Sequence, residues 1–256
     1  MSTFIKPKKH LGQHFLKDDN IARKIVDSLQ SAEISILEIG PGMGVLTKFL
    51  LELPDKECYF MDTDRDSIQY LNEAFPEHTD RFIHADFLKF DLNKLFSGRI
   101  AIIGNFPYNI SSQILFKVLD HRQQVTQVVG MIQKEVAERL AAGPGSKTYG
   151  ILSVLLQAYY RIEYLFTVNE TVFIPPPKVK SAVIRLSRND REKLDCDEVL
   201  FFKVVKTAFN QRRKTLRNSL KTFYIDYERG ELEHLASKRA EELGVEDFVR
   251  LTRLAI

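Results

Sequence analysis

The chain has 256 residues, of which 44% are hydrophobic and 28% are charged, and its formal net charge is +3. This is an ordinary globular composition, and the length suits one large domain or one domain with a small appendage. No apolar run approaches the ~18 residues of a membrane-spanning helix, and the basic N-terminus lacks the apolar core of a secretory signal. Cys58 and Cys196 form no metal or redox motif. We therefore expect a cytoplasmic protein with reduced cysteines and no metal site.

Short apolar runs alternate with amphipathic stretches through roughly the first 190 residues. The runs are continuous, which is typical of strands that are buried on both faces of a parallel sheet beneath helices. We therefore expect an α/β fold with a mostly parallel, doubly wound sheet, which binds ligands at the carboxyl ends of its strands. The expected strands are residues 34–39, 58–61, 81–85, 100–103, 125–132, 164–168 and 182–186.

Helices are expected between these strands. Residues 45–53 and 111–120 each place their apolar side chains on one face, and Ser111 or Ser112 is the expected N-cap of the second helix. After a polar linker that follows residue 186, only helical patterns remain, at about 197–222, 230–242 and 246–254, with Gly230 and Gly244 between them. We therefore predict one domain over residues 1–189 and a small all-helical domain over residues 190–256.

Positive charge is concentrated in two places along the chain. Clustered positive charge on a nearly neutral protein indicates a surface for a polyanion, although a solvated helix face is the alternative. Residues 203–221 contain no acid, and they carry Lys203, Lys206, Arg212, Arg213, Lys214, Arg217 and Lys221. The N-terminus adds Lys6, Lys8, Lys9 and Lys17.

The first expected strand ends in the glycine-rich turn "ILEIGPGMG", in which Gly40 and Gly42 let backbone amides approach a ligand. The glycine spacing is not that of the dinucleotide fingerprint, and no phosphate-binding Gly-Lys-Ser/Thr is present. Asp62 ends the second strand, about twenty residues later, where a carboxylate can accept both hydroxyls of a ribose. Asp64 is the rival for this position. Together with the third strand end, described next, the pattern indicates a nucleoside site, with a structural turn as the alternative.

The third expected strand ends at Asp86, where an acid can accept from an adenine amino group, and Phe87 beside it could cover the ring. The fourth strand ends in "GNFPYNISS". There the Asn105 side-chain carbonyl and a backbone carbonyl just before or at Pro107 could hold the two N–H bonds of an exocyclic amine. This geometry suits methyl transfer to a nucleobase amine, and Tyr108 could stack on a flipped-out base. The alternative is an ordinary strand-exit turn.

A second aromatic and proline-rich stretch, "FIPPPKVKSAVIRL", precedes the last expected strand. Phe173 could close the other face of a flipped base. Three prolines would make a stiff wall, and Lys178 and Lys180 could meet phosphates. A packing loop is the alternative.

Five segments together resemble a known family: "GQHFL", "EIGPGMG", "NFPYNIS", "FIPPPKVKSAV" and "AFNQRRKTLRNSL". In this order, across about residues 6–222, they look like the ribosomal small-subunit RNA adenine dimethyltransferases, which are S-adenosylmethionine-dependent class I methyltransferases. The resemblance implies a Rossmann-like sheet of seven strands with a small helical C-terminal domain. It also implies transfer of four methyl groups to N6 of two adjacent adenines in the 3′-terminal hairpin of 16S rRNA, as part of maturation of the small ribosomal subunit.

The resemblance also implies a role for particular residues. Tyr108 and Phe173 would sandwich the adenine, and the Phe106 backbone carbonyl would matter more than its side chain. His14, Asp62 and Phe106 replace the commoner Asn, Glu and Leu of the family. The residues that match the cofactor site are His14, Leu16, Gly40, Gly42, Asp62, Asp86 and Asn105. Arg212, Arg213, Lys214 and Arg217 would bind RNA phosphates without reading sequence.

Several alternatives remain open at this point. The nearest is the related antibiotic-resistance methyltransferase that modifies adenine in 23S rRNA, although "GQHFL" and "AFNQRRKTLRNSL" favour the 16S branch. A DNA adenine methyltransferase is disfavoured because no separate target-recognition domain is evident. A different class is a mainly non-catalytic factor that binds the immature small subunit. We expect a monomer whose partner is 16S rRNA, with no DNA or membrane partner.

Overall fold

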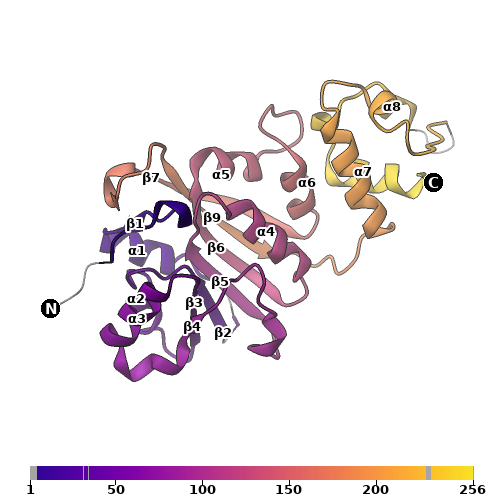
Figure 1. The fold of residues 1–256 in the computed structure, drawn as a ribbon. Coiled ribbons are helices and arrows are strands. Elements are labelled where there is room, and N and C mark those ends of the chain that lie inside the picture. The colour runs from indigo at the N-terminus through magenta and orange to yellow at the C-terminus, as the bar shows by residue number, and fades with distance from the viewer. Residues whose placement is uncertain (1–4, 31, 34, 229–231, 256) are drawn as a thin grey trace. The chain divides into compact units, whose positions relative to one another are not determined.

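The structure is a computed structural model that describes residues 5–30, 32–33, 35–228 and 232–255. The chain forms two compact units (Figure 1). The first comprises residues 1–137 and 163–188, and the second comprises residues 138–162 and 189–256. Residues 138–162 thus lie in the second unit, although the sequence pattern groups them with the first domain. The functional boundary at residue 189 stays a prediction.

The first unit is built on a seven-stranded sheet in the order β4-β3-β2-β5-β6-β9-β7. Four neighbouring pairs, from β4 through to β6, are parallel, and β9 runs antiparallel to β6. The predicted fold class and all seven predicted strands are confirmed, apart from Ile34, which lies outside the described residues. The strands are β2 (Ser35–Ile39), β3 (Glu57–Asp62), β4 (Phe82–His84), β5 (Ile100–Asn105), β6 (Val125–Gln133), β7 (Tyr160–Val168) and β9 (Ser181–Arg188).

Helices of the first unit pack their apolar faces on this sheet, and Figure 1 shows α4 crossing over the strands. A buried core joins Ile25 of α1 and Leu50 of α2 to sheet residues such as Ile103 and Val129. Burial on both faces accounts for the continuous apolar strands that the sequence displays. The helices are α1 (Asp19–Val26), α2 (Thr47–Leu50), α3 (Arg65–Ala74), α4 (Ser111–Asp120) and α5 (Lys134–Ala141), which runs on into the second unit.

Two helix expectations need correction in the first unit. The helix expected over residues 45–53 is the single turn of α2, with turns on either side. The N-cap of α4 is Ile110, so the serine cap was wrong. Ser111 is instead the first helical residue, and its hydroxyl donates to the Tyr108 carbonyl at 3.4 Å.

The second unit is helical beyond residue 189, as expected. Its helices are α6 (Ile151–Gln157), α7 (Glu198–Asn210), α8 (Leu216–Ser219), α9 (Glu233–Ala236) and α10 (Val245–Arg253). The single helix expected over residues 197–222 was wrong. The helix α7 ends at Asn210. Thr215 is extended, and it pairs with Arg239 in an antiparallel bridge. Gly230, expected between helices, lies outside the described residues.

A two-stranded antiparallel sheet was missed by the sequence pattern. It joins β1 (Phe15–Leu16) to β8 (Phe173–Ile174), with Leu16 opposite Phe173. Strands of two residues are too short to give a periodic signal. This pairing holds the N-terminal segment against the proline-rich loop that follows β8.

A buried carboxyl group lies beneath the glycine-rich turn. Glu38 of β2 is 1% exposed, and the Thr47 hydroxyl of α2 donates to its Oε2 at 2.7 Å. Burial raises the pKa of Glu38 to about 8, and the nearby charge of Asp62 adds to this effect. Folding therefore favours the protonated carboxyl, because the unfolded chain ionises at the ordinary value near 4.5.

We expect stability to depend on pH through Glu38. The folded state holds a proton that the unfolded state releases between pH 4.5 and 8, so the contribution of this group falls by up to about 1.4 kcal/mol per pH unit across that window. Glu38→Gln should remove this contribution to the slope. The free energy of unfolding of the variant, compared with that of the parent, should therefore be more favourable at pH 8 than at pH 5. Denaturant unfolding at several pH values measures the difference. A variant with the parent's full pH slope would show that Glu38 is not its source.

Candidate functional site

A cavity of about 350 Å³ lies at the carboxyl ends of the parallel strands in the first unit. The turns that follow β2, β3, β4 and β5 meet there, as they do in doubly wound sheets. An N-terminal segment contributes a further wall. The lining residues are Leu11, Gly12, Gln13, His14, Phe15, Gly40, Gly42, Asp62, Thr63, Asp86, Leu88, Asn105, Phe106, Pro107, Tyr108, Asn109 and Ile110.

The glycine-rich turn needs glycine for both conformation and space. Gly40 and Gly42 have φ angles of 69° and 54°, in the left-handed region. A Cβ atom on Gly42 would lie 2.8 Å from Cε1 of Phe15, which is closer than a side chain can approach. Both glycines line the cavity, as predicted, so a ligand there meets backbone.

The two rival carboxylates have different surroundings. Asp62 ends β3 and lines the cavity, where its oxygens accept from Gly42 N at 3.2 Å and Asp64 N at 2.8 Å. Burial raises the pKa of Asp62 to about 6, against the opposing effect of these hydrogen bonds. Asp64 does not line the cavity and caps α3 through Asp66 N. Of the two, only Asp62 is positioned to touch a ligand there.

Asp64 is fully engaged with the N-terminal segment. Its carboxylate accepts from Lys8 Nζ at 2.6 Å and from Gln13 Nε2 at 2.9 Å. Burial opposes ionisation, but these hydrogen bonds outweigh it and lower the pKa of Asp64. Asp64 therefore anchors the segment that covers the cavity.

The third strand end presents Asp86 to the cavity, as predicted, and Leu88 in place of Phe87. Asp86 Oδ1 accepts from Leu88 N at 2.9 Å, which turns the chain tightly. The Phe87 ring is buried, with the Lys117 ammonium 5.0 Å from its centroid, and Lys117 also donates to the Phe87 carbonyl at 2.5 Å. The expectation that Phe87 covers a ligand ring does not fit this position.

Asn105 lies at the end of β5, and its side-chain orientation is set by one contact. Asn105 Nδ2 donates to the His14 carbonyl at 2.9 Å. A carbonyl can only accept, so the amide nitrogen must face His14 and Oδ1 faces elsewhere. The residue before Asn105 is glycine because β5 lies close to β2 there: a Cβ atom on Gly104 would lie 2.4 Å from the Ile39 carbonyl.

Tyr108 has two partners that fix its ring. The ring stacks on His14 with centroids 5.5 Å apart, and its hydroxyl lies 2.5 Å from the buried Ser181 Oγ. His14 Nδ1 lies 2.7 Å from the Pro175 carbonyl. Ser181 was missed by the sequence pattern, because nothing within "KSAV" distinguishes it from a packing serine. Burial raises the pKa of the Tyr108 hydroxyl, so it remains protonated at neutral pH.

Besides Phe87, two more predicted site residues, Leu16 and Phe173, do not line the cavity. The side chains of Leu16 and Phe173 are 4% and 1% exposed and belong to the hydrophobic core, where β1 and β8 place them side by side. Phe106 lines the cavity, but its ring packs against Gly130, where a Cβ atom would lie 2.5 Å away. The predicted stacking role of Phe173 is therefore not supported by its position.

The predicted RNA-binding cations also differ in their surroundings. In the second unit, Arg212 Nε pairs with Glu241 and its Nη2 donates to the Lys147 carbonyl. Arg213, Lys214 and Arg217 are exposed, and Arg217 lies 5.5 Å above the Tyr227 ring. In the first unit, Lys178 and Lys180 are exposed on the proline-rich loop.

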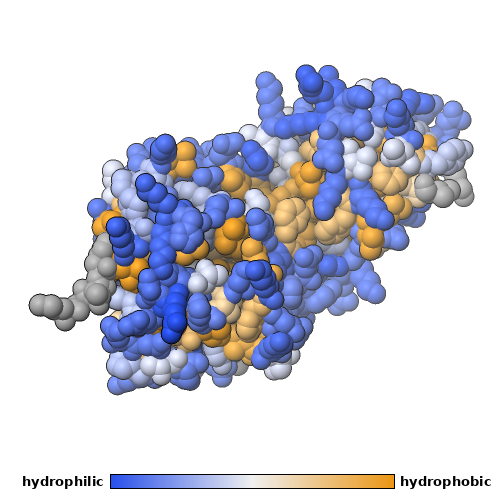
Figure 2. Space-filling model, viewed as in Figure 1, coloured by the Kyte–Doolittle hydropathy of each residue, from blue (hydrophilic) through white to orange (hydrophobic). Residues whose placement is uncertain are grey.

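The described residues show neither a metal-binding cluster nor a membrane-spanning helix. In that part of the chain, acids, cysteines and histidines do not gather into a group able to hold a metal. Nor do the described helices include one with the length and apolar character to span a bilayer. On the face in view in Figure 2, hydrophilic side chains predominate and hydrophobic ones show in smaller patches.

Comparison with known proteins assigns the chain to a family. The family model for ribosomal RNA adenine dimethylase matches residues 5–255. Proteins named ribosomal RNA small subunit methyltransferase A, from Parabacteroides distasonis and Cytophaga hutchinsonii, are 60% and 59% identical to it. Both alignments cover 98% of this chain, with 94% and 97% of those proteins.

Solved structures share the fold. A dimethyladenosine transferase from Plasmodium falciparum has a TM-score of 0.77 at 26% identity, over 93% of this chain and 96% of that one. A 23S rRNA methyltransferase has a TM-score of 0.75 at 24% identity, over 94% and 99%, and at that identity it shows the fold alone. Because the family model spans nearly the whole chain, the protein belongs to the ribosomal RNA adenine dimethylase family.

Proposed function

We propose that the protein dimethylates N6 of two adjacent adenines in the 3′-terminal hairpin of 16S rRNA, within an immature small ribosomal subunit. By family it is an rRNA adenine dimethyltransferase, and S-adenosylmethionine is its cofactor. The main structural support is that Asn105 and Tyr108 line the same cavity as the strand-end carboxylates Asp62 and Asp86. The names of the close relatives support small-subunit RNA as the substrate. We also propose that it works in the cytoplasm as a monomer.

The cavity residues fit S-adenosylmethionine. Gly40 and Gly42, which have positive φ angles, present only backbone atoms to the cavity, so a ligand can approach them closely. Asp62 Oδ2 accepts from Gly42 N and Oδ1 accepts from Asp64 N, and the Thr63 backbone N–H adds a further contact. A carboxylate has about four lone-pair sites, so it can still accept a ribose hydroxyl. Asp86 is placed to accept from an adenine amino group. When bound, the cofactor supplies a methyl group activated by a sulfonium.

Asn105 is the residue that we assign to orienting the target amine. With Nδ2 committed to the His14 carbonyl, Oδ1 is the atom available to accept an amine N–H. The Pro107 carbonyl already accepts from Ile110 N at 3.1 Å, which favours the Phe106 carbonyl as the second acceptor. Two acceptors would direct the nitrogen lone pair toward the methyl group and so lower the barrier to transfer.

Tyr108 is the stacking platform for the flipped-out adenine in this proposal. Its hydroxyl contact with Ser181 holds the ring in one orientation before the base arrives. The His14 ring stacks on the Tyr108 ring in the structure. On binding, the adenine would either stack beside His14 or displace it from the ring. Basic residues outside the cavity, Lys178, Lys180, Arg213, Lys214 and Arg217, would contact phosphates. We do not assign that role to Arg212, because its guanidinium is already paired.

The substrate is tested by incubating the protein with labelled S-adenosylmethionine and unmethylated small subunits. We expect N6,N6-dimethyladenosine at two adjacent positions near the 3′ end of 16S rRNA, located by primer extension. A parallel reaction with 23S rRNA should stay unlabelled. Label in 23S rRNA alone would instead identify the antibiotic-resistance type of activity.

Asn105→Ala should lower kcat by about 10²- to 10³-fold, because the amine loses one of its two acceptors. Binding to the unmethylated small subunit should persist. Asn109→Ala provides a comparison at the same cavity and should lower kcat by less than about tenfold, since the mechanism assigns no acceptor role to Asn109. Methylation at the parent rate by Asn105→Ala would contradict the mechanism.

Tyr108→Phe and Ser181→Ala each remove one partner of the same hydroxyl pair. We expect each to reduce kcat/KM, and the double variant to be no worse than the more affected single, with a coupling of about 1 kcal/mol. Tyr108→Ala should cost a further ~1–3 kcal/mol through lost base stacking. Strictly additive losses would mean that Ser181 does not position the ring.

Arg212→Gln and Arg213→Gln are matched neighbours with different expected outcomes. Arg213→Gln should weaken binding to the small subunit and reduce the salt dependence of binding, with the log–log slope falling by about 1. Arg212→Gln should instead lower the free energy of unfolding by about 1 kcal/mol at most, because its half-exposed ion pair is lost. Binding assays across KCl concentrations and denaturant unfolding separate the two effects. Equal effects on binding from both variants would refute the distinction.

A further inference from the structure

The N-terminal segment from residue 5 to residue 16 forms a strap along one side of the cavity. Residues 11–15 of the strap line the cavity. Its far end is held by the Asn105 hydrogen bond to the His14 carbonyl and by the pairing of Leu16 with Phe173. The near end is held by Lys8 and Gln13, which both donate to the Asp64 carboxylate, and the Lys8 backbone N–H also donates to Gln13 Oε1 at 2.8 Å. The strap is therefore held in a fixed position along the cavity.

Lys8 forms ion pairs with two acidic residues of the protein. Its ammonium lies 2.6 Å from Asp64 Oδ1 and 2.8 Å from Asp66 Oδ2. The hydrogen bonds to Asp64 and Asp66 raise the pKa of Lys8. Two carboxylates thus neutralise this lysine and fix its position, so Lys8 is an anchor of the strap.

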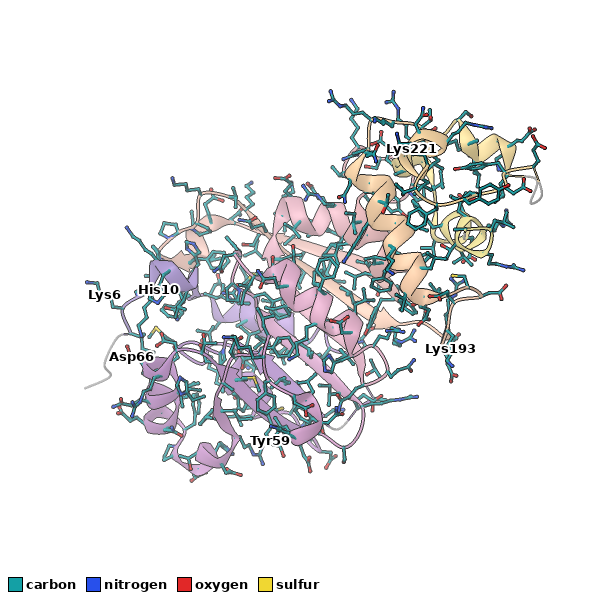
Figure 3. The ribbon with its side chains drawn as sticks, turned by 45° about the vertical axis from the view of Figure 1, so that its right-hand side comes forward. Lys6, His10, Tyr59, Asp66, Lys193 and Lys221 are labelled. Atoms are coloured by element: carbon teal, nitrogen blue, oxygen red, sulfur yellow. The ribbon has the colours of Figure 1, made fainter. Side chains whose placement is uncertain are left out.

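The flanking lysines of the strap are different. Lys6 and Lys9 are exposed, and neither side chain meets a carboxylate in the described parts of the chain. Figure 3 shows Lys6 at the outer side of the strap, with His10 beside it and Asp66 below. The strap also lies against the loop that carries the exposed Lys178 and Lys180, because His14 Nδ1 contacts the Pro175 carbonyl. Unpaired positive charge therefore borders the wall of the cavity.

We propose that Lys6 and Lys9 bind the backbone phosphates of the nucleotides next to the target adenine. This proposal rests on the proposed function, since it concerns the RNA whose base enters the cavity. A flipped-out base leaves its flanking phosphates outside the pocket, where contacts position the strand without reading its sequence. Lys9 is only two residues from Leu11, at most ~7 Å of extended chain, so its long side chain can reach phosphates at the cavity edge. The strap would then bind RNA on its outer side while it lines the cofactor cavity on its inner side.

The test is a double variant, Lys6→Gln with Lys9→Gln, in the full-length protein. Binding to unmethylated small subunits is measured across a KCl series, and S-adenosylmethionine binding is measured separately by calorimetry. We expect the log–log salt slope to fall in magnitude by about 1.5 to 2, because about two phosphate contacts are lost. The dissociation constant for S-adenosylmethionine should match that of the parent, because the inner wall is unchanged.

A matched control removes the same charge from the opposite edge of the sheet. Lys94→Gln with Arg99→Gln changes two exposed cations just before β5 begins, whereas the cavity lies where β5 ends. This control should keep the parent's salt slope. The proposal is overturned if the strap variant binds subunits like the control, or if its cofactor binding weakens along with RNA binding, which would indicate a displaced strap. Failure of the parent to methylate small subunits would instead overturn the proposed function.

Discussion

The hydrogen bond from the Asn105 amide to the His14 carbonyl organises the site, because it fixes two elements at once. It orients the Asn105 amide so that Oδ1, the only acceptor of this side chain, faces away from His14. It also ties the N-terminal strap to the end of β5, which makes residues 11–15 a wall of the cavity. The orientation of Asn105 and the N-terminal wall of the cavity therefore depend on the same contact.

The neighbouring carboxylates Asp62 and Asp64 differ in their partners. Lys8, which holds the strap, is paired with Asp64 and Asp66, and the described residues provide no cation for Asp62. Burial without a cation raises the pKa of Asp62 to about 6. A carboxylate held by backbone N–H groups keeps lone pairs for neutral hydroxyls, whereas a lysine partner would compete for them. Because the cation lies on the neighbouring acid, these surroundings support the ribose-binding role that we propose for Asp62.

The parts of this site that sequence reasoning can reach are the ends of the long strands. Continuous apolar runs located β2, β3, β4 and β5, and the rule that parallel strands bind ligands at their carboxyl ends then placed Gly42, Asp62, Asp86 and Asn105 together. Each of these residues follows a strong local signal, so small errors in the strand bounds did not matter.

The parts that it missed depend on contacts between distant segments. The strap rests on pairing between residues 15–16 and residues 173–174, which no local period reveals. Phe87 and Phe173 were expected to face a ligand because aromatic residues stack on bases, but core packing decided their orientation. Arg212 looked like its neighbour Arg213, and only the fold brings Glu241 and the Lys147 carbonyl to it.

The cavity alone does not explain the choice of RNA. A 23S rRNA methyltransferase has the same fold over nearly all of this chain, and in the mechanism that we propose Asn105, Phe106 and Tyr108 would act on an adenine amine whatever RNA strand carried it. Under the proposed function, discrimination between RNAs would then come from groups that meet the RNA outside the pocket. Phosphate contacts position a strand without reading its sequence, so under the proposed function each unit would select its RNA through the cations that it leaves exposed. Under the proposed function, the internal pairing of Lys8 and Arg212 would then matter as much as the exposure of Lys9 and Arg213, because the pairing would determine which charges an RNA meets.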